Sequence, residues 1–238
     1  MGIANSVISN REMYRTMYTE KWNKIMLREN SKVEYKLYKK KNGNYLIYIK
    51  IPSEIVPNFY YDTVIEFYPN EKPLIGSNSL ANYYVKFYSN DPAFVYTYAH
   101  AFIKNELFIE DLKPKMSKLA VRKEAKLKNP QNTVGYCKSL YFAWLVIKSR
   151  GLLNKTHYIM AEDYNKNNLL SQIEDANIKV ADREKAQETI DKKEKKKRDI
   201  ERKASNSSKS SNNTKVISST SKVKKTGGIK KSKVISKK

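Results

Sequence analysis

The sequence predicts an α+β fold: a small, mainly antiparallel sheet of three or four strands packed with about four helices, then a charged helix and a disordered basic tail. Alternating apolar and polar residues predict the strands, and capped runs with helical spacing predict the helices. A shift toward lysine and away from apolar residues marks the C-terminal part. These observations divide the chain into a globular domain over 1–160, a helical spacer over 161–201 and a disordered Lys/Ser-rich tail over 202–238.

The first predicted elements are a helix and a β-hairpin. Ser9 and Glu12 match the capping-box pattern, and apolar residues three to five apart follow on one face, so residues 10–29 are expected to be helical. The hairpin covers residues 33–51, with the sequence VEYKLYKKKNGNYLIYIKI. Its apolar residues alternate with polar ones, and Asn42-Gly43 supplies a turn that tolerates positive φ.

Two further strands and three helices complete the predicted globular domain. The strands are expected at residues 60–68 and 83–88, which are rich in tyrosine and β-branched residues. A helix begins at Asn90-Asp91-Pro92, where a capping residue precedes proline. A third helix is predicted from Pro114 to Lys128, before Asn129-Pro130. A fourth is predicted from Thr133 to Arg150 and should be the most buried, since it is apolar on nearly every side.

The C-terminal part has a different composition. Residues 161–190 carry a net charge of −3, and residues 179–204 combine helix-forming residues with closely spaced opposite charges. This pattern predicts a solvated helix and offers too few apolar residues for a coiled coil. Residues 202–238 contain twelve Lys or Arg and no Asp or Glu. Such a segment buries too little apolar area to offset its ordering entropy.

The net charge of +23 indicates a polyanionic partner. Nucleic acid, an anionic membrane surface and an acidic protein are the usual partners of so basic a chain. A competing interpretation is a codon bias, because Lys, Asn, Ile and Tyr are all encoded by A/T-rich codons. A single cysteine, Cys137, excludes an intrachain disulfide and leaves a cysteine-based zinc site without enough ligands.

The sequence does not predict an enzyme, a metal site or a cofactor. Its two histidines, His100 and His157, have no acidic motif beside them, and we interpret Cys137 as a core residue. Gly227-Gly228 matches neither the P-loop nor the dinucleotide-binding pattern. Scattered carboxylates leave a nuclease as an alternative, although the sequence gives no reason to pair any of them. These acids are Glu66, Glu106, Glu110, Asp111, Glu162 and Asp163.

Two groups of basic residues are predicted to contact the phosphate backbone of nucleic acid. On the third predicted helix, residues spaced three, four and four apart form one exposed row, with a solvated helix face as the alternative. This row is Lys115, Lys118, Arg122 and Lys126. The second group, in the tail, is Lys222, Lys224, Lys225, Lys230, Lys231, Lys233, Lys237 and Lys238.

The hairpin suggests two further interpretations. Lys36, Lys39, Lys40 and Lys41 form a second basic patch near its turn. Tyr38 and Tyr48 lie on or near the face opposite the inferred core, where exposed aromatic rings could stack on the bases of a single strand. The alternative is a sheet covered on both faces, which would bury both rings.

Several segments of the chain have a composition that is similar to that of a known group of proteins. These segments are FYYDTVIEFYPN, NYYVKFYSND, NPQNTVGYCKSLYFAWLVIKSRGL and the basic Ser/Lys tail. They resemble, in style over much of the chain, small proteins of phages that infect low-GC bacteria. The resemblance carries over no functional residue. It implies a virion component or a DNA-associated accessory protein, in the cytoplasm of the bacterial host or in the virion.

Three functions are therefore considered. The first is a non-enzymatic, sequence-independent nucleic-acid-binding accessory protein, with DNA ahead of RNA, whose basic C-terminal arm contacts phosphates. The second is a virion structural protein whose globular domain assembles with itself or with other virion proteins. The third, ranked last, is a peripheral membrane protein held by its lysines and by a myristoyl group on Gly2, which the start MGIANS permits.

Overall fold

The computed structural model describes residues 33–69, 78–125 and 128–211. The predicted first helix, Lys126 and the tail beyond residue 211 lie outside the described residues. The chain divides into two compact units, Met1–Ile190 and Asp191–Lys238, which are described separately below.

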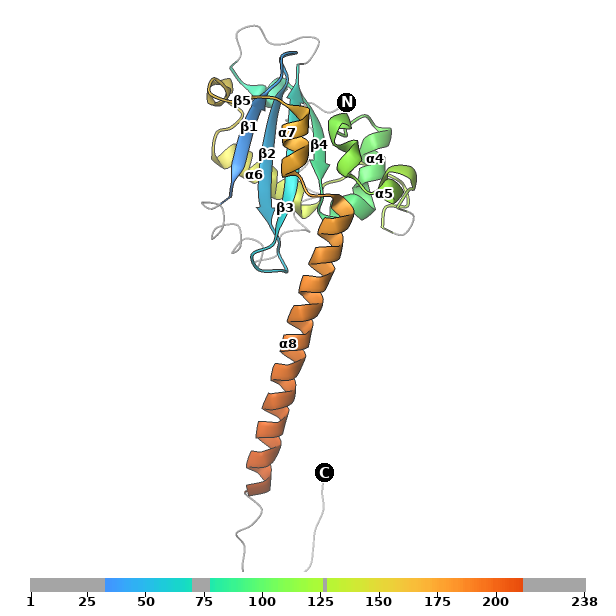
Figure 1. Cartoon of the computed structure of the whole chain (residues 1–238), viewed down its shortest axis with the longest axis vertical. Helices are drawn as coiled ribbons and strands as arrows, with labels where there is room; N and C mark the ends of the chain where they lie inside the picture. The colour runs from blue at the N-terminus through green and yellow to red at the C-terminus, as the bar shows by residue number, and fades with distance from the viewer. Residues whose placement is uncertain (1–32, 70–77, 126–127, 212–238) are drawn as a thin grey trace, which may run out of the picture. The chain divides into compact units, whose positions relative to one another are not determined.

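The first unit contains a five-stranded sheet with the order β4-β3-β2-β1-β5 (Figure 1). Its four longer strands are antiparallel neighbours: β1 Tyr35–Lys39, β2 Tyr45–Pro52, β3 Tyr60–Tyr68 and β4 Tyr84–Ser89. The two-residue strand β5, Glu162–Asp163, pairs in parallel with β1 and makes the sheet mixed. The α+β class is confirmed, with a fifth strand too short to show an alternating pattern in the sequence.

The β1–β2 hairpin forms where the sequence predicts it. Leu37 pairs with Ile47, and the turn places Gly43 at φ 83°, a left-handed conformation that glycine adopts without steric cost. The backbone N–H of Lys40 donates to the carbonyl of Asn44 at 2.8 Å and closes the turn. On the inner strand β3, every residue from Tyr61 to Phe67 is buried, so both faces of the sheet belong to the core.

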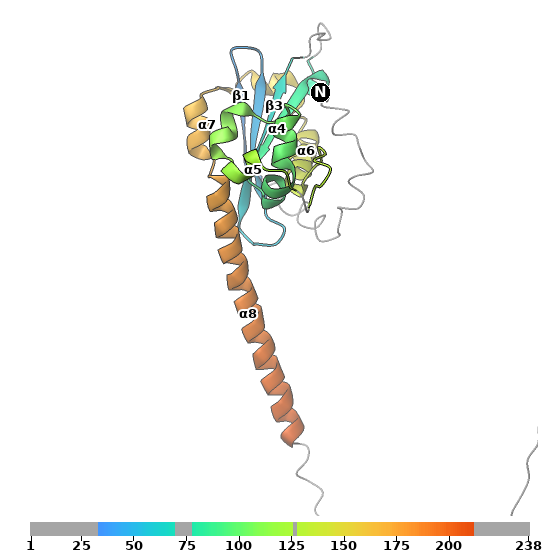
Figure 2. The ribbon, with the colours of Figure 1, turned by 90° about the vertical axis from the view of Figure 1, so that its right-hand side faces the viewer.

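Helix α6, Lys138–Ser149, covers one face of the sheet, and seven of its twelve residues are buried. The helix ends before Gly151, which has φ 65°, as predicted. It begins five residues later than predicted, because the backbone is still extended at its N-cap, Cys137, with ψ 165°. Figures 1 and 2 place α6 and α7 on opposite faces of the sheet.

The second face is covered by α7, Lys166–Gln172, and by the beginning of α8, Ala176–Ser211 (Figure 2). Leu169 and Ile173 are each 1% exposed and belong to the hydrophobic core. The boundary that the sequence predicts after residue 160 therefore lies inside the first unit, since apolar packing continues past it.

Short helices follow β4. A helix that starts after Asp91 contains the π-helical stretch η3, Phe94–Tyr98, and continues as α4, Ala99–Lys104. The 3₁₀ helix η4, Glu110–Lys115, and the single turn α5, Lys118–Arg122, come next. Between α4 and η4, the carbonyl of Leu107 accepts a hydrogen bond of 2.8 Å from Phe87 on the β4 edge. Two other 3₁₀ helices are η2 Leu80–Asn82 and η5 Lys155–Tyr158.

In the second unit, the described residues are the continuation of α8 to Ser211. All side chains from residue 191 to residue 205 are exposed, as predicted for a solvated helix. Residues 202–211, predicted to be disordered, are helical, which extends the charged helix by ten residues. In the part of the chain that the structure describes, no helix combines the length and apolarity that crossing a bilayer requires.

Candidate nucleic-acid interface

The predicted row of basic residues does not lie on one helix. Lys115 ends the 3₁₀ helix η4, whereas Lys118 and Arg122 occupy the five-residue helix α5. Between them, Met116 and Ser117 have non-helical ψ values of 150° and 126°. The single helix predicted from Pro114 to Lys128 is therefore wrong, although Lys118 and Arg122 remain four residues apart and exposed.

The apolar residues of this segment explain the difference. Leu119, although apolar, is 56% exposed, whereas Met116 is 3% exposed without being helical. The backbone turns extended again at Lys123, and Asn129 then organises a loop. The Asn129 side chain donates to the carbonyl of Thr133 at 2.8 Å and accepts from the Thr133 N–H at 3.0 Å. These two bonds hold the loop over residues 129–133, which follows the predicted helix.

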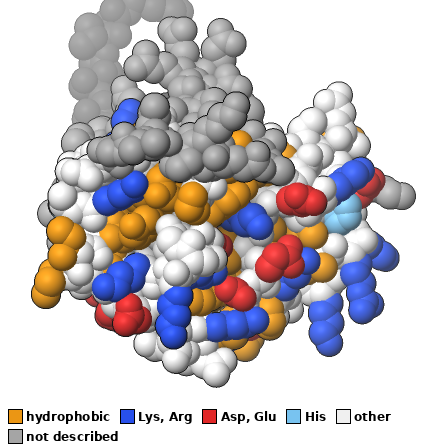
Figure 3. All heavy atoms as spheres, turned by 90° about the horizontal axis from the view of Figure 1, so that it is seen from above, with side chains coloured by type: hydrophobic (Ala, Val, Ile, Leu, Met, Phe, Trp, Pro, Cys, Tyr) orange, Lys and Arg blue, Asp and Glu red, His pale blue; other side chains and the backbone are white. Residues whose placement is uncertain are grey.

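Carboxylates accompany several lysines around α5. Lys113 forms an ion pair of 2.5 Å with Glu110, and Lys104 lies 3.9 Å from Glu124. Figure 3 shows one face of the molecule, on which Lys and Arg side chains alternate with acidic, apolar and uncharged surface. The ion pairs with Glu110 and Glu124 therefore reduce the net positive charge around α5. Contact between the basic residues of α5 and nucleic acid stays a prediction.

The hairpin lysines interact largely within the first unit. Lys36 donates a hydrogen bond of 2.7 Å to Gln172 on α7, and Lys39 lies 3.9 Å from Asp163 on β5. The Lys40 side chain is only 15% exposed. Lys41 is exposed at the turn. The patch expected here is reduced, because Lys36 and Lys40 hold other elements against β1.

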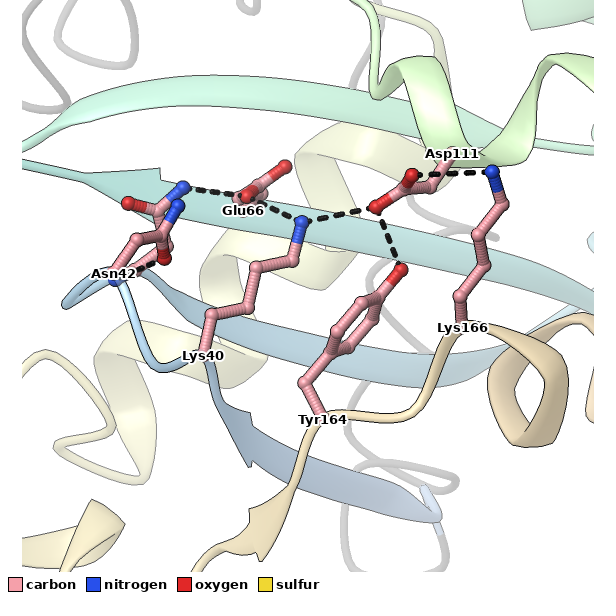
Figure 4. Close-up of polar contacts among 7 residues, drawn as sticks. Lys40, Asn42, Glu66, Asp111, Tyr164 and Lys166 are labelled. Carbon is pink, nitrogen blue, oxygen red and sulfur yellow. Dashed lines mark hydrogen bonds and ion pairs between the residues drawn. The ribbon is translucent and has the colours of Figure 1, made fainter.

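Lys40 is the centre of a polar cluster that joins four parts of the first unit (Figure 4). Its ammonium group lies 2.9 Å from Glu66 Oε1 on β3 and 3.1 Å from Asp111 Oδ2 on η4. It also lies 4.4 Å from the centroid of the Tyr164 ring. Lys166, at the start of α7, approaches Asp111 Oδ1 at 3.4 Å.

Hydrogen bonds complete this cluster and shift its pKa values. Tyr164 donates to Asp111 at 2.8 Å, and Asn44 donates to Glu66 at 2.7 Å. Partial burial opposes the ionised form of Asp111, but the hydrogen bonds from Tyr164, Lys40 and Lys166 outweigh it and lower the pKa of Asp111. Burial, followed by the bond to Asp111, raises the pKa of the Tyr164 hydroxyl.

The Lys40 cluster stabilises the fold of the first unit and is poorly suited to binding phosphate. Two carboxylates already neutralise Lys40, and their negative charge repels a further anion. Glu66 and Asp111, which the sequence names only as scattered acids, meet through Lys40. Among the described residues, no group of three or more His, Cys, Asp or Glu side chains is placed to hold a metal ion.

The two tyrosines considered for base stacking are buried. Tyr38 is 1% exposed and donates to Gln172 at 3.3 Å, while Tyr48 is 3% exposed and donates to Asp62 at 2.7 Å. The stacking interpretation is therefore wrong, because residues after position 160 fold back over this face of the sheet. The sparse apolar positions of that segment gave little sequence signal for such packing.

A pocket of about 400 Å³ lies beside the start of α6, and acidic, thiol, hydroxyl and amino side chains of the kinds that enzymes use in catalysis line it. Its lining includes Asp91, Cys137, Ser139 and Lys138. Burial, followed by repulsion from Asp91, raises the pKa of the Cys137 thiol. The Cys137 sulfur also lies 2.9 Å from Ser139 Oγ. A thiol in this setting stays protonated at neutral pH and is a poor nucleophile.

The histidines do not supply a base to this pocket. His100 Nδ1 lies 3.2 Å from Asn132 Oδ1, and His157 is exposed on η5. Neither residue lines the pocket. Burial also raises the pKa of Asp91, with the Ala93 N–H and Ser139 opposing that rise. Asp91 caps the helix that follows β4, since its carboxylate accepts the Ala93 N–H at 2.9 Å.

The tail lysines predicted to contact phosphate lie outside the described residues. They are Lys222, Lys224, Lys225, Lys230, Lys231, Lys233, Lys237 and Lys238. Their role remains a prediction that depends on charge alone. No protein-family model, curated protein or solved structure matches the chain.

Proposed function

We propose that the chain is a non-enzymatic protein that binds nucleic acid without sequence preference through its basic C-terminal segment. The observation that carries this proposal is the charge of residues 202–238, which hold twelve basic residues and no acidic one. Lysines that neutralise phosphates release the counterions condensed on a nucleic acid, and this release supplies affinity without a fixed binding geometry. Contacts to phosphate carry no sequence information, so the binding is sequence-independent.

The first unit supports the proposal through the arrangement of its polar groups. The largely buried Lys40 is neutralised by Glu66 and Asp111, and the Cys137 thiol stays protonated. We therefore assign the folded domain a supporting role and the C-terminal segment the contact with phosphate. DNA is put ahead of RNA because the resemblance in composition to small phage proteins implies a virion component or a DNA-associated accessory protein.

The test compares two full-length variants with the unaltered chain. In the first, the nine lysines between residues 212 and 238 are changed to Gln, and in the second they are changed to Arg. Fluorescence anisotropy with a mixed-sequence DNA duplex, measured at several salt concentrations, reports the affinity. We expect the Gln variant to bind weakly, because it lacks the nine positive charges, and the Arg variant to bind like the original chain, because it keeps them.

Equal affinity of the Gln variant and the original chain would refute this assignment. The alternatives have tests of their own: presence in purified particles for a virion structural protein, and salt-sensitive binding to anionic vesicles but not to DNA for a membrane protein.

A further inference from the structure

We propose that the exposed part of α8 is a second contact surface for duplex nucleic acid, with one side of the helix facing the duplex. The sequence assigns this part of the chain to a spacer. The proposal rests on the proposed function for the identity of the polyanion, and it adds a binding surface with a defined geometry. Its residues all lie in the second unit, between positions 192 and 204.

The charges of this helix are sorted by side. With about 100° between successive residues of an α-helix, seven of the fourteen positions from 191 to 204 fall within an arc of about 140°. Five of the seven are lysines, and the other two are small or apolar. We call these seven residues the lysine arc: Lys192, Lys193, Lys196, Lys197, Ile200, Lys203 and Ala204.

The rest of the helix circumference has the opposite character. It carries every acidic residue of the stretch, together with three basic ones: Asp191, Glu194, Lys195, Arg198, Asp199, Glu201 and Arg202. On this side Arg198 forms an ion pair of 3.6 Å with Glu194, one turn away. The two sides therefore have net charges of +5 and −1, although the stretch as a whole looks like a mixture of charges.

The lysine arc is exposed, and it brings like charges close together on one side of the helix. All side chains from residue 191 to residue 205 are exposed in the structure. Like charges four residues apart destabilise a helix, and the arc contains two such pairs, Lys192 with Lys196 and Lys193 with Lys197. Asp199 and Glu201 lie four residues from Lys203 and Lys197 and offset part of the arc's charge, and a row of phosphates would reduce the repulsion between the lysine pairs further.

The dimensions fit duplex nucleic acid. Lys192 and Lys203 are separated by about 16 Å along the helix at a rise of about 1.5 Å per residue. Duplex DNA carries about one negative charge per 1.7 Å of its axis, which exceeds the number of lysines available to neutralise it. An α-helix with its side chains is about 10–12 Å wide, and the major groove of B-DNA is about 12 Å wide. Lysines on both edges of the arc can then contact the phosphates of the two strands.

The arc also suits binding without sequence preference. It contains no Arg, Asn or Gln, whose planar groups read base edges most selectively. Lysine is a flexible point charge, and Ile200 and Ala204 offer apolar contact only. The surface is therefore suited to a phosphate backbone of any sequence.

Two matched variants of the full-length chain test the proposal. K193Q/K196Q/K203Q removes three charges from the lysine arc, and K195Q/R198Q/R202Q removes three charges from the other side. Glutamine has nearly the helix propensity of lysine and arginine, so α8 is retained, which circular dichroism verifies. Binding to a mixed-sequence DNA duplex of two to three helical turns is measured by anisotropy across a range of salt concentrations.

The arc variant is expected to bind about tenfold more weakly or worse, with the slope of log K against log salt reduced by about 0.9 for each lost phosphate contact. The control variant should change affinity by less than about threefold, because its side also carries four carboxylates. Equal losses in the two variants would overturn the proposal, since charge without geometry would then explain binding.

The tail variant described above separates the two proposals. A loss in the tail variant with none in the arc variant rejects the lysine arc and keeps the proposed function. A loss in the arc variant with none in the tail variant supports the arc and rejects the tail as the contact segment.

Discussion

Replacing Lys40 with methionine should destabilise the first unit strongly, although Lys40 lies beside an exposed turn. Methionine keeps most of the length of the side chain and removes its ammonium group. The change leaves Glu66, whose side chain is 7% exposed, and Asp111, 31% exposed, without their shared cation. Two carboxylates then face each other across a poorly hydrated space.

The magnitude follows from the burial of the three groups. Removing one partner of a fully buried ion pair costs about 3–5 kcal/mol. The partners of Lys40 keep other donors, since Asn44 bonds to Glu66 and Tyr164 bonds to Asp111, and Asp111 is partly hydrated. We therefore expect the free energy of unfolding to fall by about 2–3 kcal/mol, below the fully buried range.

Urea unfolding followed by tryptophan fluorescence measures this loss, with Lys39→Met as the matched control. Lys39 is 44% exposed and lies 3.9 Å from Asp163, which is 91% exposed, so its replacement should cost less than about 0.5 kcal/mol. Adding Glu66→Gln to Lys40→Met should restore part of the stability, because a neutral amide tolerates the site. A loss for Lys40→Met no larger than that for Lys39→Met would refute the role given to the cluster.

Three further predictions concern the first unit. The pKa of Asp111 is lowered in the folded state, so its ion pairs stabilise the fold above the unfolded pKa of about 3.9 and lose this effect as pH falls through the folded pKa. The difference in unfolding free energy between the original chain and Lys40→Met, measured by urea unfolding, should therefore shrink in acid. A difference that stays constant from pH 7 to pH 3 would contradict this prediction. The Cys137 thiol should react with a disulfide reagent at pH 8 far more slowly in the folded chain than in urea, because burial raises its pKa and blocks access; equal rates would show an accessible thiolate. Tyr48→Phe should lower the free energy of unfolding by about 1–2 kcal/mol in the same assay, because Asp62 loses a buried donor at 2.7 Å, and an unchanged value would exclude that bond.

The strands were predictable because alternation and turn chemistry act locally. Strand β3 has the predicted bounds, Tyr60–Tyr68, and Gly43 occupies the expected turn. Helix α6 was identified by its apolar residues, and its end at Gly151 by the preference of glycine for positive φ. Its start was placed too early, because nothing in residues 133–137 indicates an extended approach to the helix.

Packing between distant parts of the sequence was not predictable. The burial of Tyr38 depends on α7, more than 120 residues away along the chain, where Leu169 and Ile173 are too sparse to indicate a packed face. Lys40 likewise looks like a surface lysine until the fold brings Asp111 beside it. In the spacer, the mixture of charges hid the sorting of lysines onto one side of α8, which appears only once a continuous helix is established.

The dependence of DNA binding on salt tests the central claim most directly. For the original chain and for a chain that ends at Ser211, log K is measured against log salt with one mixed-sequence duplex. If about half of the nine lysines beyond Ser211 contact phosphates, the longer chain should have a slope steeper by about 4. Identical slopes for the two chains would show that these lysines make no phosphate contacts and would contradict the account.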